Sequence, residues 1–314
     1  MESEIVCLGE ALIELNQLPE KGKDVFYSSF GGDVSNVAIA IARQGSSAGI
    51  ISLVGEDLFG DQLLELWQRE GVNHTYVSKI SNASTGIYFV THDSKGHHFS
   101  YFRKDSAASQ ITPENLPSAY IASAKFLHFS AISQAISSSS NDVVNASIKI
   151  AIENSVLISY DTNLRLKLWS LDKARETIQQ TIPYVDFLFP SLEDSILLTG
   201  LKEPTAIVDY YLKNGAKLVA LKLGAEGVLL GTEDGFQRIH GETVETEDAT
   251  GAGDIFDGAF LSEWQKNRNP LESARYANAA AALSTIGFGA VEPIPYRLAV
   301  EKFITSHSNK VSTR

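Results

Sequence analysis

A regular alternation of short apolar runs with amphipathic stretches constrains the fold of this chain more than any other feature. Each apolar run is long enough for one strand and too short for a helix. The stretches between them repeat apolar residues at three- and four-residue spacing, as in Asn36–Gln44, which is the pattern of a helix with one buried face. Strands that alternate with helices favour a mostly parallel sheet covered on both faces. We therefore predict an α/β fold with a doubly wound sheet.

The predicted strands are Ile5–Leu8, Ala48–Leu53, Lys125–Phe129, Val156–Tyr160, Asp186–Phe189 and Leu218–Lys222. The predicted helices are Asn36–Gln44, Asp61–Glu70, Asn141–Glu153, Leu171–Ile182, Glu203–Asn214, Asp254–Gln265 and Leu271–Ile286. Length alone would suggest two domains of about 150 residues each. No linker interrupts the pattern, however, so we expect residues 1–314 to form a single domain.

Two segments depart from this alternation. Residues 24–31 form a short extended segment that ends in a glycine pair, and residues 85–103 have the period of a β-hairpin around a turn at Asp93–Gly96. The pattern allows two placements for the hairpin, at the edge of the main sheet or in a separate sheet above a cleft. The pattern leaves both placements open; in the second, residues 24–31 and 85–103 would form a small β-sheet lid.

The charge of the chain limits its partners. The formal net charge is −12, and such an acidic chain repels the phosphate backbone of nucleic acid. A small anionic substrate would need local positive potential from a few arginines or helix N-termini.

Cys7 is the only cysteine, so no disulfide can form within the chain. No run of roughly 20 apolar residues predicts a membrane span, and the acidic N-terminus lacks the basic start of a signal peptide, so we expect a cytoplasmic protein.

The segment Asp248–Asp254, with the sequence Asp-Ala-Thr-Gly-Ala-Gly-Asp, gives the strongest chemical signal. Its small residues let a ligand approach the backbone, and they precede a predicted helix whose N-terminal amides attract a phosphate or a developing anion. A carboxylate at Asp254 can accept a proton from a hydroxyl there. Anion donors beside a base are suited to phosphoryl transfer to an alcohol. The structural alternative is that Asp254 caps the helix beside a simple turn.

This segment resembles the C-terminal signature of the ribokinase-like (PfkB) carbohydrate kinases. The resemblance implies a ribokinase-like fold in which Asp254 is the catalytic base and the preceding backbone forms an anion hole. The catalytic residues implied in this way are Asp254, Gly251, Ala252 and Gly253. The chain also contains Gly31–Ala38, which resembles the sugar-binding segment of the family. It contains no Gly-x-x-x-x-Gly-Lys-Ser/Thr, so a P-loop kinase is not predicted.

The same resemblance implies ATP as the phosphoryl donor. The implied nucleotide contacts are Asn163, Lys222, Gly224, Gly227, Gly251, Gly253, Asn278 and Ala281. An Asn-x-x-Glu segment organises Mg²⁺ in these kinases, largely through water, and Ser191 and Asp194 occupy the matching positions here. Both residues differ from the common pattern, but an aspartate is still a hard oxygen ligand suited to Mg²⁺, and Glu193 is the neighbouring alternative. A monovalent-cation site is left open.

Two further segments, Tyr101–Ser109 and Asp161–Ser170, resemble those of 2-keto-3-deoxygluconate kinases. The implied substrate contacts are Gly32, Asn36, Tyr88, Tyr101, Arg103, Arg165 and Asp254. Arg103 and Arg165 suit a substrate carboxylate, because a guanidinium pairs with it through two hydrogen bonds. We predict an ATP-dependent kinase that phosphorylates the terminal hydroxyl of 2-keto-3-deoxygluconate. Fructokinase is the alternative, because fructokinases have similar segments and hold an aspartate where Glu14 stands.

Two other functions stay open on the sequence alone. A non-catalytic sugar- or nucleotide-binding protein on the same fold is compatible with the unusual Ser191 and Asp194. A nucleoside kinase of the same family is a second alternative, although two arginines fit an acid better than a neutral nucleoside. The lids of the family often pair between subunits, so we expect a homodimer through the lid, and we expect no nucleic-acid or membrane partner.

Overall fold

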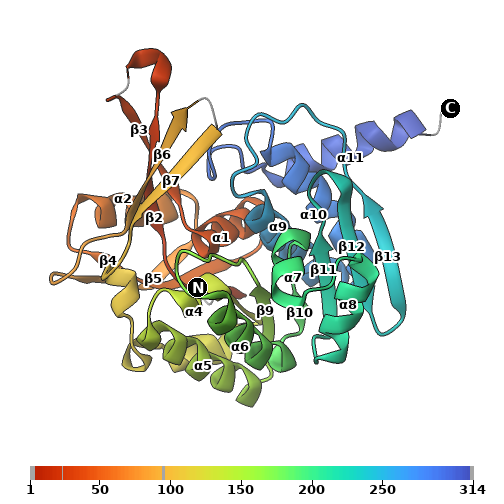
Figure 1. Ribbon diagram of the computed structural model, residues 1–314, viewed down its shortest axis with the longest axis horizontal. Helices are drawn as coiled ribbons and strands as arrows, with labels where there is room; N and C mark the ends of the chain where they lie inside the picture. The colour runs from red at the N-terminus through yellow and green to blue at the C-terminus, as the bar shows by residue number, and fades with distance from the viewer. Residues whose placement is uncertain (1–3, 23, 94–95, 312–314) are drawn as a thin grey trace.

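The computed structural model describes residues 4–22, 24–93 and 96–311, and within them nine strands form one central sheet (Figure 1). The strand order is β13-β12-β11-β10-β9-β8-β1-β4-β5. All neighbours from β11 to β5 pair in parallel, whereas β12 and β13 are antiparallel additions at one edge. The prediction of a doubly wound, mostly parallel sheet is confirmed.

The six predicted strands are all present, as β1 (Ile5–Leu8), β4 (Ala48–Gly55), β8 (Phe126–Ser130), β9 (Leu157–Asp161), β10 (Phe187–Leu188) and β11 (Leu218–Lys222). The sheet also contains three strands that the apolar pattern did not predict, β5 (Asn73–Ile80), β12 (Gly227–Thr232) and β13 (Gly235–His240). β5 and β13 are edge strands with mostly exposed or half-buried residues. Edge strands bury too little surface to need a continuous apolar run.

The helices are α1 (Asp33–Arg43), α2 (Leu58–Arg69), α3 (Ser118–Ser123), α4 (Ala131–Ala135), α5 (Ser138–Glu153), α6 (Leu171–Thr181), α7 (Leu192–Thr199), α8 (Pro204–Lys213), α9 (Ala252–Asn267), α10 (Pro270–Ser284) and α11 (Arg297–Val311). Short 3-10 turns occur at Pro19–Lys21, Ala107–Gln110, Pro113–Asn115, Ile182–Tyr184 and Gly224–Glu226. α11 lies beyond the predicted helices. The helices of the described chain are too short or too polar to span a lipid bilayer.

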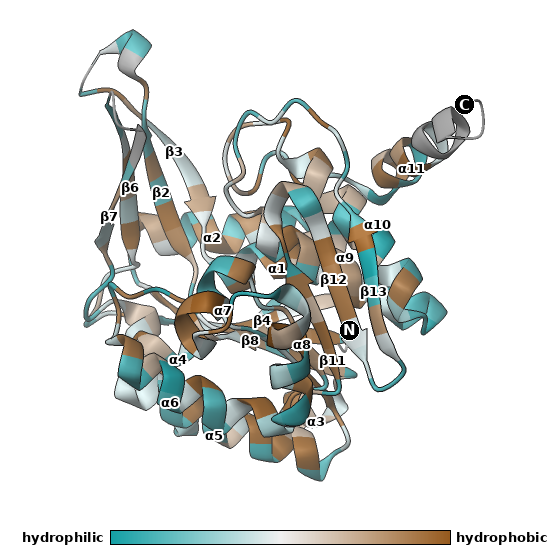
Figure 2. Ribbon diagram, turned by 45° about the vertical axis from the view of Figure 1, so that its right-hand side comes forward, coloured by the Kyte–Doolittle hydropathy of each residue, from teal (hydrophilic) through white to brown (hydrophobic). Residues whose placement is uncertain are grey.

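Two apolar cores lie on the two faces of the sheet. Successive strand residues point to opposite faces, so Ile5 and Cys7 of β1 join one core and Val6 and Leu8 join the other. α1, α2, α9 and α10 cover the first face, and α3, α5, α6 and α8 cover the second. Figure 2 shows this layering as hydrophobic colour along β11 and β12 in the interior and hydrophilic stretches on the outer helices α5 and α6.

A second sheet of four strands stands beside the first in the described part of the chain (Figure 1). Its order is β3-β2-β6-β7, formed by β2 (Leu12–Gln17), β3 (Phe26–Gly31), β6 (Ile87–Asp93) and β7 (Gly96–Phe102). The hairpin β6–β7 pairs with β2 and not with the nine-stranded sheet, which decides between its two predicted placements. The turn residues Ser94 and Lys95 lie outside the described residues.

β2 is the part of this second sheet that the sequence did not predict. Its residues alternate apolar and polar, with Glu14 and Asn16 pointing to one face, and both are buried. A strand with buried polar residues on one face does not produce an apolar run, so the pattern gave no signal for it. Because β2 follows β1 directly, it connects the end of the central sheet to the second sheet.

Candidate active site

The N-terminus of α9 forms the centre of the candidate site. α9 begins at Ala252, and Gly251 precedes it with a φ of 78°, in the left-handed region that favours glycine. A methyl group added to Gly251 would lie 3.3 Å from both the Cβ and the carbonyl oxygen of Ala290, so a side chain there would also be crowded. The predicted loop of small residues therefore leads directly into α9. Because these residues have little or no side chain, they leave the first backbone N–H groups of the helix uncovered.

Asp254 lies in the first turn of α9 and is buried. Asn36 Nδ2, from the first turn of α1, donates a hydrogen bond to Asp254 Oδ2 at 2.8 Å. The other polar atom of that amide, Asn36 Oδ1, is buried and has no hydrogen-bond partner among the described residues. Asn36 therefore orients the carboxylate with one end of its amide and offers an acceptor with the other.

Burial raises the pKa of Asp254 to about 7, and the nearby carboxylate of Asp33 adds to the effect, while the hydrogen bond from Asn36 and the charge of Lys222 oppose it. A carboxyl group with this pKa is close to half ionised at neutral pH, which suits a general base. Asp33 is itself buried in α1, where Ser130 Oγ donates to its Oδ2, and burial raises its pKa as well.

Lys222 ends β11 and points at the same place. Its Nζ donates to Asp161 Oδ2 at 3.0 Å and to Asp257 Oδ1 at 3.1 Å. A methyl group added to Gly253 would lie 3.4 Å from Nζ, which places the ammonium beside the first turn of α9. Burial lowers the pKa of Lys222, but the two carboxylates outweigh that effect and hold the pKa above its ordinary value. Lys222 is therefore charged at neutral pH.

The other predicted nucleotide contacts lie on elements around β11. Gly224 and Gly227 bound the 3-10 turn that joins β11 to β12. Asn278 of α10 donates through Nδ2 to the carbonyl of His240 at 3.0 Å, and Ala281 follows it on the same helix, half-buried. Asn163 is buried just beyond β9, and its amide N–H donates to Asp161 Oδ1 at 3.0 Å.

The predicted sugar contacts lie on the side of α9 that faces the second sheet. Gly32, at the start of α1, has a φ of 103°, and a methyl group there would lie 2.7 Å from the carbonyl oxygen of Glu10. Tyr88 and Tyr101 are cross-strand neighbours on β6 and β7 and stack with ring centroids 5.4 Å apart. Tyr88 donates its hydroxyl to Glu14 Oε2, and burial raises the pKa of Glu14.

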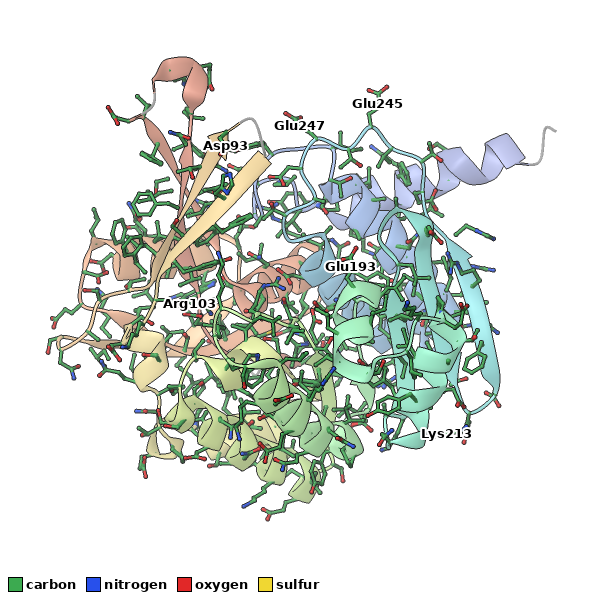
Figure 3. The ribbon with its side chains drawn as sticks, in the orientation of Figure 1. Asp93, Arg103, Glu193, Lys213, Glu245 and Glu247 are labelled. Atoms are coloured by element: carbon green, nitrogen blue, oxygen red, sulfur yellow. The ribbon has the colours of Figure 1, made fainter. Side chains whose placement is uncertain are left out.

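The two predicted carboxylate partners differ in their surroundings. Arg103 lies where the second sheet joins the main body (Figure 3), and it forms an ion pair with Glu10, a buried residue that the sequence analysis did not single out. Burial, together with the charge of Arg165, lowers the pKa of Arg103 to about 10. Arg165 is exposed, donates through Nη1 to the carbonyl of Leu164 at 3.0 Å, and forms no ion pair with any described residue. Of these two arginines, Arg165 is therefore the one that has no carboxylate partner among the described residues.

The proposed metal-organising positions lie at the start of α7. Ser191 caps this helix, its Oγ accepting from the Asp194 amide at 3.1 Å. Asp194 Oδ2 accepts from the Leu164 amide at 3.0 Å, and burial raises its pKa. Glu193 is exposed at the same helix start (Figure 3). Among the described residues no three His, Cys, Asp or Glu side chains form a metal cage.

A cavity of about 370 Å³ separates the second sheet from the loop that precedes α9. One wall is formed by residues of the second sheet, Glu14, Asn16, Val90 and Phe99. The other wall is formed by residues 247–250 and Phe288, and Figure 3 shows Glu247 on this loop. The second sheet therefore faces the glycine-rich loop across an open space that adjoins Glu14.

Comparisons with known proteins agree with this geometry. A family model described as pfkB family carbohydrate kinase matches residues 2–297. The chain belongs to the pfkB family of carbohydrate kinases. A 2-dehydro-3-deoxygluconokinase of Thermoproteus tenax is 33% identical over 304 residues, which cover 93% of this chain and 91% of that protein. A chloroplastic protein of Arabidopsis thaliana named probable fructokinase-6 is also 33% identical, over 95% of this chain and 81% of that protein.

Solved structures of the family share the fold. A fructokinase from Xylella fastidiosa, solved with bound ATP, superposes with a TM-score of 0.90 at 25% identity, covering 98% of this chain and 100% of that chain. Membership of the pfkB family, together with its kinase relatives, makes this protein a phosphotransferase that acts on a sugar hydroxyl. The relatives include both predicted substrate classes at equal identity, so the comparisons leave the particular sugar undecided.

Four acidic residues of this pfkB kinase were missed by sequence reasoning. They are Glu10, Asp33, Asp161 and Asp257, all buried beside predicted site residues. Asp33 and Asp161 belong to segments that were already assigned to the site, so their proximity to those motifs was a usable signal, whereas nothing in the sequence singled out Glu10. Asp257 lies one helical turn after Asp254, which also places it on the same side of α9.

Proposed function

We propose that this pfkB kinase transfers the γ-phosphoryl group of ATP to the terminal hydroxyl of 2-keto-3-deoxygluconate. The observation that carries the proposal is the unmatched charge of Arg165. This exposed guanidinium has no ion-pair partner among the described residues. Burial raises the pKa of Asp33 and of Tyr101, and the charge of Arg165 opposes that rise in both groups. A cation in that position supplies the local positive potential that an acidic substrate needs in a chain of net charge −12.

Asp254 performs the central step of the proposed reaction. Its carboxylate accepts the proton of the substrate hydroxyl, and the hydroxyl oxygen then forms a bond to the γ-phosphorus as the bond to the leaving oxygen of ADP breaks. The amides at Gly251, Ala252 and Gly253 and the Lys222 ammonium stabilise the negative charge on the transferred group. Asn36 holds the Asp254 carboxylate by the 2.8 Å hydrogen bond, and its free Oδ1 accepts from a sugar hydroxyl.

The proposed nucleotide site lies on the far side of α9 from the second sheet. Lys222, Gly224, Gly227, Asn163, Asn278 and Ala281 would border ATP, together with Gly251 and Gly253. Mg²⁺, when bound, would neutralise phosphate charge, and Asp194 would hold it through water. The fit rests on the half-buried carboxylate of Asp194, a hard oxygen ligand that the Leu164 amide orients through one hydrogen bond.

We further propose that residues 1–314 act as one kinase domain in which the second sheet is a lid. The cavity between this sheet and the loop at residues 247–250 is the space that such a lid would close. The sheet also exposes Tyr27 of β3 and Phe102 of β7, which are 52% and 63% exposed. Exposed aromatic residues on a small sheet favour a protein contact, which supports a homodimer through the lid.

Fructokinase is the second candidate, and Glu14 favours it. This buried carboxylate accepts hydrogen bonds from Tyr88 and, at 3.2 Å, from Asn16 Nδ2, and it lines the cavity beside the lid. Such a group suits the hydroxyls of a neutral sugar, and its negative charge would repel a substrate carboxylate placed close to it. An acidic substrate would therefore have to bind with its carboxylate toward Arg165 and away from Glu14.

A substrate panel tests the proposal directly. ATP consumption is measured with 2-keto-3-deoxygluconate, its galactonate epimer, fructose, ribose and adenosine, for the wild type and for Arg165→Ala. We expect the keto-deoxy acid to give the highest kcat/KM, and Arg165→Ala to reduce that value at least about tenfold more than the value for fructose. Arg275→Ala is the matched control, because Arg275 is an exposed arginine that pairs with Glu272 on α10. Equal losses for both sugars would refute the carboxylate role, and preference for fructose would favour the second candidate.

A further inference from the structure

Asp257 is a completely buried carboxyl group one helical turn after Asp254 on α9, with an exposed fraction of 0%. A buried carboxyl group is costly unless a partner compensates it. Its partner is Lys222, which reaches it from β11. The proposed reaction uses Asp254 and Lys222 but gives Asp257 no contact with the sugar or the nucleotide.

Three elements meet at the Lys222 ammonium. Asp161 from the end of β9 and Asp257 from α9 accept hydrogen bonds from Nζ at 3.0 Å and 3.1 Å. The side chain of Lys222 is 14% exposed, so little of the ammonium can be solvated by water. A lysine has a flexible four-carbon stem, and its charge stays at one point only where neighbours fix it. Here two acceptors on separate elements do so.

The charge balance of this cluster leaves a positive pole toward Gly253. Burial raises the pKa of Asp257, and the charge of Asp161 raises it further against the opposing charge of Lys222. Burial also acts to raise the pKa of Asp161, but the charge of Lys222 together with the hydrogen bonds that Asp161 accepts outweighs it, and the pKa is lowered. Asp161 is thus an ionised carboxylate beside the charged Lys222. The negative end lies toward the sheet, and the positive end lies beside the first turn of α9.

We propose that Asp257 is a positioning residue that, with Asp161, fixes the Lys222 ammonium beside the Gly253 amide. In that place the ammonium stabilises charge on the phosphoryl group during transfer. This inference rests on the proposed position of the phosphoryl group at Gly251–Gly253. It assigns to Asp257 an indirect role, exerted only through Lys222, in addition to the direct role of Asp254.

Three variants test the assignment. Lys222→Met removes the charge, Asp257→Ala removes one anchor of that charge, and Asp257→Asn keeps an oxygen acceptor in nearly the same volume. The chain offers a matched control on the same strand, because Lys217, just before the start of β11, pairs with Asp186 at 2.6 Å. Asp186→Ala removes a buried aspartate that pairs with a lysine at the opposite end of β11, away from α9. Steady-state kinetics, urea unfolding and calorimetric binding of ADP and of a non-hydrolysable ATP analogue are measured for each.

We expect Lys222→Met to lower kcat by about a hundredfold, as for loss of one anion-stabilising group. Asp257→Ala should lower kcat by about tenfold, the effect of a displaced charge. Asp257→Asn should restore a large part of that loss. Lys222→Met and Asp257→Ala should also weaken binding of the ATP analogue more than binding of ADP, because the ammonium lies where the terminal phosphate would be. This binding difference is measured without turnover.

The proposal is overturned by a purely structural effect of Asp257→Ala. In that case the variant loses as much stability in urea as Asp186→Ala does. Its kcat, and its ratio of affinities for the ATP analogue and for ADP, then equal the wild-type values. The proposal is also overturned if Asp257→Asn is as slow as Asp257→Ala although it folds. Should Asp257→Ala fail to fold, Lys222→Met and Asp257→Asn still decide the matter by the same two readouts. Failure of the proposed function would appear differently, as a wild type that phosphorylates no member of the sugar panel.

Discussion

Replacing Asp254 by asparagine should strongly reduce activity and yet make the protein more stable at alkaline pH. The carboxyl group has a pKa of about 7 in the folded chain, against an ordinary value of 3.8. Each unit of difference corresponds to about 1.4 kcal/mol, so a rise of about three units corresponds to about 4 kcal/mol. The folded chain is therefore penalised by this amount for holding Asp254 ionised.

The sign of the effect follows from which state binds more protons. Between pH 4 and pH 7 the folded state keeps the Asp254 proton while the unfolded state has lost it, so the stability of the wild type decreases as pH rises through this range. Above about pH 7 both states are ionised and the full penalty applies. Asparagine is neutral at every pH, and its side-chain oxygen can still accept the hydrogen bond from Asn36. The stability difference between the variant and the wild type should therefore grow from near zero at pH 4 to about 4 kcal/mol at pH 8.

Urea unfolding of both proteins without ligands, at several pH values, measures this difference. Carboxyl groups remote from Asp254 titrate equally in the two proteins and cancel in the comparison, whereas Asp33 and Asp257, which interact with Asp254, add to the difference. In the same proteins we expect phosphate transfer by Asp254→Asn to fall by at least about a hundredfold while nucleotide binding is retained. A stability difference that does not depend on pH, or a variant less stable than the wild type at pH 8, would refute the buried, repelled carboxylate. Equal transfer rates would refute its role as the base.

Three further predictions concern neighbouring residues. Asp33→Asn should move the acid limb of the kcat/KM profile from about pH 7 to lower pH, because Asp33 raises the pKa of Asp254; a limb that stays in place would contradict this coupling. Gly251→Ala should lower the free energy of unfolding in urea by about 1–2 kcal/mol, because Gly251 has a left-handed φ of 78° and lies close to Ala290, and it should also lower kcat. Unchanged stability and kcat would mean that the loop can rearrange. Glu14→Gln should raise the ratio of kcat/KM for 2-keto-3-deoxygluconate to that for fructose, and an unchanged ratio would show that Glu14 does not face the substrate.

The central sheet was predictable because its strands are buried on both faces. A parallel strand between two helical layers is mostly apolar along its length, so β1 is an unbroken apolar run, and β8 and β9 are apolar runs interrupted by His128 and Ser159. The edges of the sheet were not predictable in the same way. β5 and β13 are largely exposed, and the information that makes them strands is their pairing with β4 and β12.

The second sheet was predicted only in part, for a related reason. β3, β6 and β7 were recognised from alternation and turn residues, but β2 has Glu14 and Asn16 buried on one face. These polar residues are accommodated by Tyr88 and by each other, contacts between segments that are 74 residues apart in the case of Glu14 and Tyr88. A local pattern does not report such long-range compensation.

By itself the sequence determined the local chemistry of this protein: a helix start of small residues with an aspartate in its first turn, and the order of strands and helices around it. Both depend on residues a few positions apart, which periodicity and motif spacing report directly. The tertiary structure alone decided which charges meet. Asn36 and Asp254 are 218 positions apart, and Lys222 joins Asp161 to Asp257 only because β9 and β11 end where α9 begins. The pairing of Arg103 with Glu10, which leaves Arg165 unmatched, follows equally from packing, because the energy of a charge depends on its neighbours in space.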